Sequence, residues 1–201
     1  FSSGAVYGTS LGASTRHRED LLGASKPDES VAGYASGKRA AEYIASAFCD
    51  EHDIRLAIAR CFAFTGPGIP LDGPFALSDF ISGALSSNRR ISIAGDGSTV
   101  RSYMYATDFV DWILRMLVSV EPHLTLNVGG ERELTMIDVA ELIAGLFRYK
   151  VDIDVKYDSS VATTTYLPDL EMAFGKGFRL RVQSDEAVRR TVNYFRGDSL
   201  T

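Results

Sequence analysis

The chain has 201 residues, of which 45% are hydrophobic and 23% charged, a composition typical of a globular protein with a substantial core. Its formal net charge of −5 argues against nucleic acid or an anionic membrane as a partner, because both attract clustered lysine and arginine. No apolar run approaches the roughly 18 residues that span a bilayer, and no signal peptide is visible. Two cysteines, Cys49 and Cys61, are too few for a disulfide framework, so we expect reduced thiols and a cytoplasmic protein.

The chain opens with Phe1-Ser2-Ser3-Gly4 and has no initiator methionine. An apolar start that runs directly into serine and glycine is typical of the end of a buried strand that leads into a loop. We therefore expect that further sequence precedes Phe1 in the parent protein.

Hydrophobic periodicity and turn residues predict alternating helices and strands after a long surface loop over residues 8–33. Helices are expected at residues 34–52, 75–85, 108–118, 136–147, 170–174 and 184–195, and strands at residues 54–64, 91–94, 124–128 and 151–157. Thr135 and Asp138 have the spacing of a capping box, and Thr107 or Asp108 is the candidate cap of the third helix. This alternation indicates an α/β fold.

Two helices carry apolar residues at helical spacing. In the first, Ala41, Ile44, Ala45 and Phe48 recur with polar residues between them, which predicts an apolar face. In the third, Trp112 belongs to a similar pattern, so we expect it in the core rather than in a ligand site.

Tyr34 and Lys38 stand four residues apart at the start of the first predicted helix, so their side chains share one face. A phenol has a reference pKa of about 10 and is a poor base near neutral pH, but a nearby ammonium favours its ionised form. The pair therefore suits general acid/base catalysis, although alone it is usually a surface pair. Ser3, at a predicted strand end, is placed to hold a substrate oxygen, because open α/β sheets bind ligands beyond the carboxyl ends of their strands.

Three segments occur in the order found in a known family. They are Ser2-Ser3-Gly4-Ala5-Val6-Tyr7-Gly8, Tyr34-Ala35-Ser36-Gly37-Lys38 and Arg60-Cys61-Phe62-Ala63-Phe64-Thr65-Gly66-Pro67-Gly68. With them the chain resembles the extended short-chain dehydrogenase/reductases, in particular the nucleotide-sugar epimerases and dehydratases. The resemblance continues through Gly95-Asp96-Gly97, Arg101-Ser102-Tyr103, Asn127-Val128-Gly129-Gly130 and Tyr166-Leu167-Pro168-Asp169.

The resemblance implies a hydride relay in which NAD or NADP oxidises a carbon of a nucleotide-sugar. In this relay Tyr34 takes the hydroxyl proton, Lys38 holds the nicotinamide ribose, and Ser3 bonds the same sugar oxygen. The family's cofactor-binding positions fall on Ser2, Tyr34, Lys38, Cys61 and Phe62. Its substrate-binding positions fall on Ser3, Gly4, Ala5, Ala63 and Arg101, of which Arg101 contacts the diphosphate.

Departures from the family pattern narrow the expected reaction. Gly4 and Ala5 stand where the 4,6-dehydratases carry the Asp-Glu pair that eliminates water. Neither side chain moves a proton, so the sequence favours a 4-epimerase or a 4-ketoreductase. Ala63 replaces the family's Asn, which removes one contact to the diphosphate and leaves the identity of the nucleotide-sugar open. Arg101 stands at the position of the family's arginine, and a planar guanidinium can donate two hydrogen bonds to a phosphate group.

The family's Gly-x-x-Gly-x-x-Gly loop has no match in the sequence, so we expect that these residues alone do not hold the dinucleotide. The alternative function is a catalytically incompetent module that binds a nucleotide-sugar or a partner. The intact Ser3, Tyr34 and Lys38 favour the enzyme. The three histidines lack metal-ligand spacing, and no metal site is expected.

The expected architecture is the C-terminal part of a Rossmann-like doubly wound parallel sheet with a smaller α/β substrate-binding domain. Residues 1–64 and 104–128 are assigned to the NAD(P)-binding domain, and residues 65–103 and 129–201 to the substrate-binding domain. The family dimerises through the helix that carries Tyr34 and Lys38 together with an upstream neighbour. That neighbour is not in the sequence, so a homodimer through this helix stays open.

Overall fold

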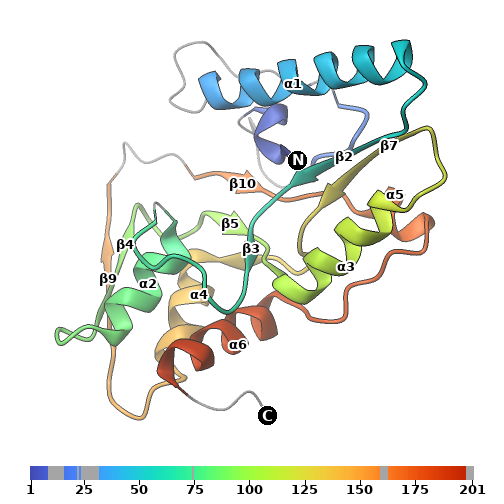
Figure 1. The fold of residues 1–201 in the computed structure, drawn as a ribbon. Helices are drawn as coiled ribbons and strands as arrows, with labels where there is room; N and C mark the ends of the chain where they lie inside the picture. Colours follow the sequence, from blue (N-terminus) through green and yellow to red (C-terminus); the bar gives the residue numbers. More distant parts are fainter. Residues whose placement is uncertain (9–15, 22, 24–31, 74, 159–162, 198–201) are drawn as a thin grey trace.

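The computed structural model describes residues 1–8, 16–21, 23, 32–73, 75–158 and 163–197 (Figure 1). The helices are η1 (Gly4–Tyr7, a 3-10 helix), α1 (Ala32–Glu51), α2 (Ala76–Leu85), α3 (Ala106–Leu117), α4 (Met136–Ala144), α5 (Glu171–Gly175) and α6 (Ser184–Arg196). The strands are β1 (Ser2–Ser3), β2 (Leu56–Cys61), β3 (Phe64–Thr65), β4 (Arg90–Ala94), β5 (Val100–Arg101), β6 (Met104–Tyr105), β7 (His123–Val128), β8 (Leu134–Thr135), β9 (Asp152–Lys156) and β10 (Thr165–Tyr166).

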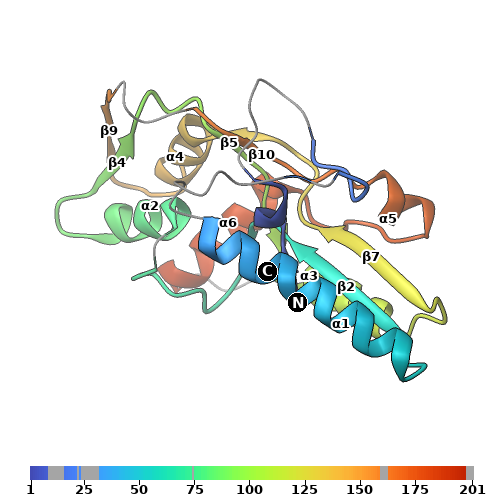
Figure 2. The same cartoon turned by 90° about the horizontal axis from the view of Figure 1, so that it is seen from above.

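A parallel sheet in the order β1-β2-β7 positions the serine-rich start of the chain. Figures 1 and 2 show α1 on one face of this sheet and α3 on the other. The α3 face buries Trp112 and Met104 against Leu126 of β7. The predicted core position of Trp112 is therefore confirmed, because its side chain is fully buried.

The remaining strands form small sheets around a second core. Strands β4 and β9 pair in parallel, β5 lies between β10 and β8, and β3 pairs with β6. Helices α2, α4 and α6 pack together there, and the core includes Phe80, Ile91, Val139 and Val188. The predicted α/β class with parallel strands is confirmed, while the division into two domains stays a prediction.

The capping box at the start of α4 is confirmed. The Thr135 hydroxyl accepts from the Asp138 amide at 3.0 Å, and the Asp138 carboxylate accepts from the Thr135 amide at 2.8 Å. The predicted cap of α3 is wrong, because Tyr105 occupies that position and no side chain caps it. Asp108 is instead buried and accepts from the amides of Arg181 and Val182, at 2.9 Å each.

Helix α1 confirms the helix predicted over residues 34–52, but the apolar residues that indicated it do not face the core. Ile44 and Phe48 are exposed, whereas the buried residues of the helix include Ala35, Glu42 and Cys49. The physical reason is a buried ion pair: Glu42 turns toward the sheet to meet an arginine of β2, and this rotation puts the apolar residues on the outside. Among the described residues, none of the helices has the length and apolar character needed to cross a bilayer. The homodimer through α1 stays a prediction.

Candidate functional site

Strand β1 ends at Ser3, and the chain then turns into η1. The Ser3 hydroxyl accepts a hydrogen bond from the Ala5 amide at 3.2 Å and so caps this short helix. Gly4 is buried and Ala5 is partly exposed. The predicted strand end is confirmed, but a 3-10 helix follows it where a loop was expected.

The first turns of α1 place Tyr34 and Lys38 beside this strand. The Lys38 Nζ donates to the Phe1 carbonyl at 3.0 Å and lies 5.8 Å from the centre of the Tyr34 ring. Tyr34 is 56% exposed, which leaves its phenol accessible to a ligand. The structure therefore brings Lys38 to β1 and keeps Tyr34 on the same helical face.

One further helical turn along, Glu42 anchors α1 to the sheet. Its carboxylate accepts from the Ser2 hydroxyl at 2.5 Å, from Arg60 Nε at 3.0 Å and from Arg60 Nη2 at 2.8 Å. Arg39 adds a weaker contact at 3.3 Å and also donates to the Val6 carbonyl at 3.0 Å. These bonds join α1, β1, η1 and β2 into one polar cluster beneath the strand that carries Ser3.

The electrostatics of this cluster follow from burial and pairing. Burial alone raises the pKa of Glu42, but hydrogen bonds from Arg60 and Ser2 and the charges of Arg60 and Arg39 hold it below its usual value. Burial opposes the charge of Arg60, yet its bonds to Glu42 and Tyr7 raise its pKa above the usual value. Both groups therefore stay ionised near neutral pH.

The same cluster extends to β7 through the phenol of Tyr7. Arg60 Nη1 donates to Tyr7 Oη at 2.9 Å, and Tyr7 Oη donates to Asn127 Oδ1 at 2.8 Å. Asn127 Nδ2 in turn donates to the His17 carbonyl at 2.7 Å. Asn127 therefore joins β7 to the phenol of Tyr7 and to the backbone of His17.

Tyr166 of β10 is a site residue that the sequence analysis did not single out. A Cβ atom added to Gly4 would lie 2.5 Å from Tyr166 Oη and 2.7 Å from Phe62 Cζ, so the phenol and the Phe62 ring fill the space beside Gly4. The rings of Tyr166 and Phe62 lie 4.6 Å apart.

Burial raises the pKa of Tyr166 to about 12, although the nearby Ser3 hydroxyl and the charge of Arg101 lower it. At neutral pH the Tyr166 phenol is therefore protonated and able to donate.

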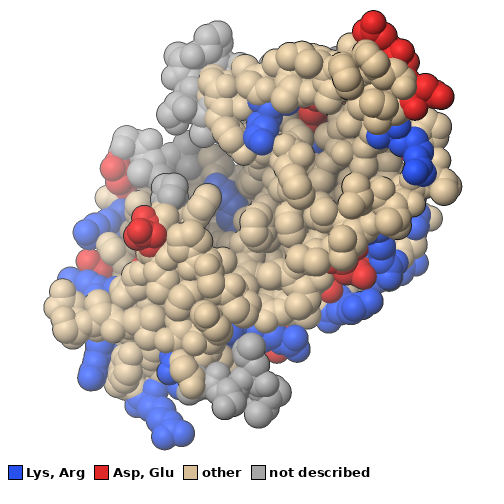
Figure 3. Space-filling model, in the orientation of Figure 1, with Lys and Arg blue, Asp and Glu red and all other residues tan. Residues whose placement is uncertain are grey.

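Arg101 lies near the Tyr166 ring. Its guanidinium carbon is 5.7 Å from the ring centre, and its nitrogens donate to the carbonyl oxygens of Val100 at 2.8 Å and Thr164 at 3.0 Å and to the Thr164 hydroxyl at 2.9 Å. Figure 3 shows a hollow in the surface between α1 and the elements below it, with basic atoms inside the hollow. The strand pair β5–β10 therefore presents an arginine and a phenol together.

The other predicted site residues lie at the end of β2. Cys61 is partly exposed, and burial raises the pKa of its thiol to about 11 while the charge of Lys38 lowers it. The Phe62 side chain is 4% exposed and packs against Tyr7 and Tyr166. Ala63 packs against the second core. The cofactor and substrate roles of these residues stay predictions.

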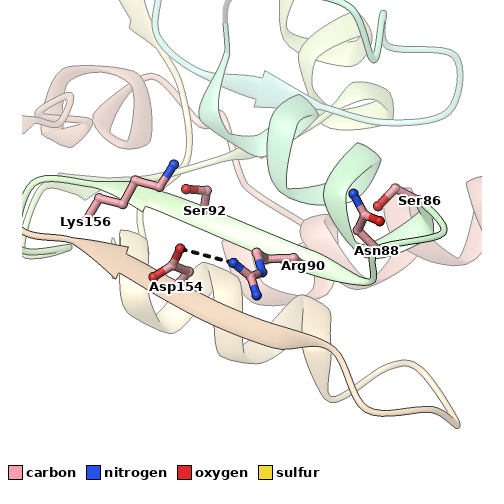
Figure 4. A pocket seen from close by; sticks show the side chains of 6 residues that line it. All are labelled: Ser86, Asn88, Arg90, Ser92, Asp154 and Lys156. Carbon is pink, nitrogen blue, oxygen red and sulfur yellow. Dashed lines mark ion pairs between the residues drawn. The ribbon is translucent and has the colours of Figure 1, made fainter.

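An open polar pocket of about 500 Å³ lies on the β4–β9 pair, away from these residues (Figure 4). Its lining is Ser86, Asn88, Arg90, Ser92, Asp154 and Lys156. Arg90 faces Asp154 across the pair at 3.6 Å, and both side chains are well exposed. None of the predicted site residues lines this pocket, so it adds nothing to the Ser3 site.

Comparison with known proteins decides the family. The model of the NAD dependent epimerase/dehydratase family matches residues 1–129, which is more than half of the chain. The chain belongs to this family. Among curated relatives in it, a UDP-glucuronic acid decarboxylase of Arabidopsis thaliana is 29% identical over 140 residues, 70% of this chain and 40% of the relative. The dTDP-D-glucose 4,6-dehydratase of Homo sapiens is 26% identical over 202 residues, 97% of this chain and 55% of the relative.

Solved structures of epimerases and dehydratases share the fold. A UDP-glucose 4-epimerase of Thermotoga maritima, solved with UDP-glucose, superimposes with a TM-score of 0.84 at 22% identity, covering 98% of this chain and 62% of the epimerase. A dTDP-glucose 4,6-dehydratase of Bacillus anthracis, solved with NAD, gives 0.80 at 24% identity and covers 98% and 60%. The chain therefore has the Rossmann-like fold of these enzymes and spans about half the length of the curated relatives it matches.

Proposed function

We propose that the protein containing these residues is an NAD(P)-dependent enzyme that epimerises or reduces a nucleotide-sugar at carbon 4 of the sugar. The observation that carries the proposal is the contact of two sequence segments, the start of the chain and the start of α1. Ser3 ends β1, Lys38 Nζ bonds the carbonyl of Phe1 in the residues leading into that strand, and Tyr34 shares the face of α1 with Lys38. Family membership supports the same chemistry.

The residues present fit the nicotinamide end of the cofactor. The ammonium of Lys38 and the accessible phenol of Tyr34 are polar groups suited to ribose hydroxyls, and Lys38 contacts the residue that precedes β1. When bound, NAD or NADP supplies the acceptor and donor of the hydride. Solved relatives carry NAD, which supports this assignment.

In the proposed mechanism Tyr34 removes the proton of the sugar hydroxyl while the adjacent carbon is oxidised. Lys38 favours the ionised form of Tyr34, which accepts this proton, and orients the ribose. Ser3 donates to the same sugar oxygen, and the proton returns from Tyr34 in the reverse step. Arg101 holds the diphosphate, because its planar guanidinium matches two phosphate oxygens.

The surroundings of Gly4 argue against 4,6-dehydration. That reaction requires acid and base side chains directly after the catalytic hydroxyl residue, at the positions of Gly4 and Ala5. A Cβ at Gly4 would meet Tyr166 Oη at 2.5 Å and the Phe62 ring at 2.7 Å, so an acid there has no room. The proposed reaction is therefore epimerisation or reduction without elimination of water.

The proposal is tested with the complete protein that contains these residues, incubated with NAD or NADP and a panel of nucleotide-sugars. Chromatography of the products and absorbance at the reduced-nicotinamide band report turnover. We expect Tyr34→Phe to lower kcat by at least about 100-fold, the range contributed by general acid/base catalysis.

Tyr43→Phe is the matched control, because Tyr43 is a phenol on the same helix and is 62% exposed. It is expected to retain wild-type turnover. Tight binding of a nucleotide-sugar with no turnover by the wild-type protein would overturn the proposal in favour of a binding module.

A further inference from the structure

The hydroxyl of Ser2 is a buried link between β1 and α1. It donates to Glu42 Oε1 at 2.5 Å, and Ser2 is 8% exposed. In the β1–β2 register Ser2 stands beside Arg60, whose Nε donates to the same carboxylate oxygen at 3.0 Å. One oxygen atom of Glu42 therefore joins β1, β2 and α1, one residue before Ser3.

A second link joins the same two segments, and it is exposed to solvent. Lys38 Nζ donates to the Phe1 carbonyl at 3.0 Å. Water competes for an exposed hydrogen bond, and in the proposed function the ammonium of Lys38 also binds the cofactor ribose. The bond between Ser2 and Glu42 is shielded from both, so it is the more durable link between β1 and α1.

The ion pair of Glu42 does not require the serine. An ionised carboxylate accepts about four hydrogen bonds. Arg60 supplies two of those at Glu42, and Arg39 adds a longer contact at 3.3 Å. Glu42 therefore keeps its counter-charge without Ser2. What the Ser2 hydroxyl adds is a bond from the strand that ends at Ser3 to the helix α1.

We propose that Ser2 is a positioning residue, whose bond to α1 sets the distance between the Ser3 hydroxyl and the phenol of Tyr34. The inference rests on the proposed function and deepens it. Strand β1 pairs with β2 through two residues, so few bonds fix the place of Ser3. A misplacement of about 1 Å between reacting groups can lower a rate about 100-fold, so a bond that anchors this strand to α1 affects catalysis.

Ser2→Ala in the complete protein tests this role, because it leaves the Glu42–Arg60 pair in place. We expect kcat to fall about tenfold while the KM for the nucleotide-sugar changes less than about threefold, as for a group that acts on the transition state. The melting temperature is expected to fall by a few degrees, the effect of one lost hydrogen bond. An unchanged kcat would overturn the proposal.

A Ser3→Ala background separates positioning from stability. In this background Ser2→Ala is expected to lower the melting temperature as before and to have no further effect on the residual kcat, because the hydroxyl that Ser2 positions is absent. Equal losses of kcat in both backgrounds would overturn the proposal, since Ser2 would then act independently of Ser3.

Thr191→Val is the matched control for the loss of a buried hydroxyl. The Thr191 hydroxyl donates to the Ala187 carbonyl at 2.7 Å and bonds the Thr65 hydroxyl at 3.0 Å, on α6, which lies far from α1 in Figure 1. This variant is expected to lower the melting temperature by a similar amount and to keep the wild-type kcat. A loss of kcat equal to that of Ser2→Ala would overturn the proposal, because any such loss of stability would then lower turnover.

Binding of the cofactor is measured separately, because the family resemblance places Ser2 among the cofactor-binding positions. We expect the Kd for NAD to change less than about threefold in Ser2→Ala, since the Ser2 side chain bonds Glu42. A rise in this Kd of more than about tenfold, with kcat retained, would make Ser2 a cofactor contact and overturn the positioning role.

Hydrogen exchange separates this inference from the proposed function. In Ser2→Ala the amides of residues 2–7 are expected to exchange faster than in the wild type, while Thr191→Val leaves them unchanged. Unaltered exchange in Ser2→Ala overturns the inference. If the wild-type protein turns over no nucleotide-sugar, the proposed function fails, while exchange still decides whether Ser2 anchors β1 to α1.

Discussion

Glu42 and Arg60 form a two-pronged ion pair inside the protein, with Nε–Oε1 and Nη2–Oε2 distances of 3.0 and 2.8 Å. Both side chains are less than a tenth exposed, at 6% and 8%. The pair joins the third turn of α1 to β2 directly below the serines of β1. It therefore sets the rotation of the helix that presents Tyr34 and Lys38.

Removal of the Glu42 charge is expected to destabilise the protein strongly. Glu42→Gln leaves the Arg60 guanidinium buried without its counter-charge, which costs about 3–5 kcal/mol. Denaturant unfolding measures the loss. The matched control is Glu186→Gln, which breaks an exposed pair with Arg190 at 2.8 Å whose members are each 45% exposed. A loss under about 1 kcal/mol is expected for this control, and equal losses for the two variants would contradict the account.

The stabilisation by Glu42 is expected to depend on pH. Its pKa is lowered in the folded protein, so its contribution is complete above the unfolded value of 4.5 and is lost as the pH falls through the folded value. The difference in unfolding free energy between wild type and Glu42→Gln should therefore be full at neutral pH and shrink on acidification below 4.5. Urea titrations over this range measure it. A difference that grows on acidification would show that the carboxyl is protonated in the native state.

The space beside Gly4 gives a steric prediction. Gly4→Ala places a methyl group against Tyr166 Oη and Phe62, which costs about 1–3 kcal/mol as overpacking. Gly37→Ala is the control, because Gly37 lies inside α1 with nothing near its added Cβ. That change is expected to stabilise the helix by up to about 1 kcal/mol. Thermal unfolding of both variants shows whether each substitution stabilises or destabilises the protein. A stabilising Gly4→Ala would contradict the packing described.

The Cys61 thiol is expected to react slowly. Its pKa is raised by burial to about 11, so near pH 8 about one molecule in a thousand carries the thiolate that attacks an alkylating reagent. In a Cys49→Ala background, the rate of alkylation by iodoacetamide should rise steadily as the pH approaches that value. Modification at pH 8 as fast as that of a free cysteine, with its pKa of about 8.5, would contradict the buried environment.

Sequence patterns predicted helices and strands correctly where the local pattern of apolar and capping residues agrees with the packing of the folded chain. The capping box of Thr135 and Asp138 and the alternation in β4 and β9 gave α4 and the two strands close to their observed bounds. The role of Asp108 could not be predicted from local sequence. Its carboxylate accepts hydrogen bonds from two amides that are 73 and 74 residues away, and it does not cap its own helix. Such long-range partners leave no local spacing to detect.

Sequence motifs predicted the candidate site residues, but they did not predict the side chains that surround these residues. Ser3, Tyr34 and Lys38 were predicted from motif order, and their roles stay predictions, to which the structure adds the contact of Lys38 with Phe1. The inward turn of Glu42 was missed, because apolar periodicity favours Ile44 and Phe48 as the buried face. Tyr166 was not predicted near these residues because its two-residue strand has no periodicity, and its place beside Gly4 depends on pairing with β5.

The central claim is best tested by following a deuterium atom at carbon 4 of the nucleotide-sugar. In the complete protein with NAD or NADP, we predict that the deuterium appears either at carbon 4 of the epimer or in the reduced nicotinamide, and that Tyr34→Phe shows neither product. Release of the deuterium to water, or equal turnover by Tyr34→Phe, would contradict hydride transfer assisted by Tyr34, Lys38 and Ser3.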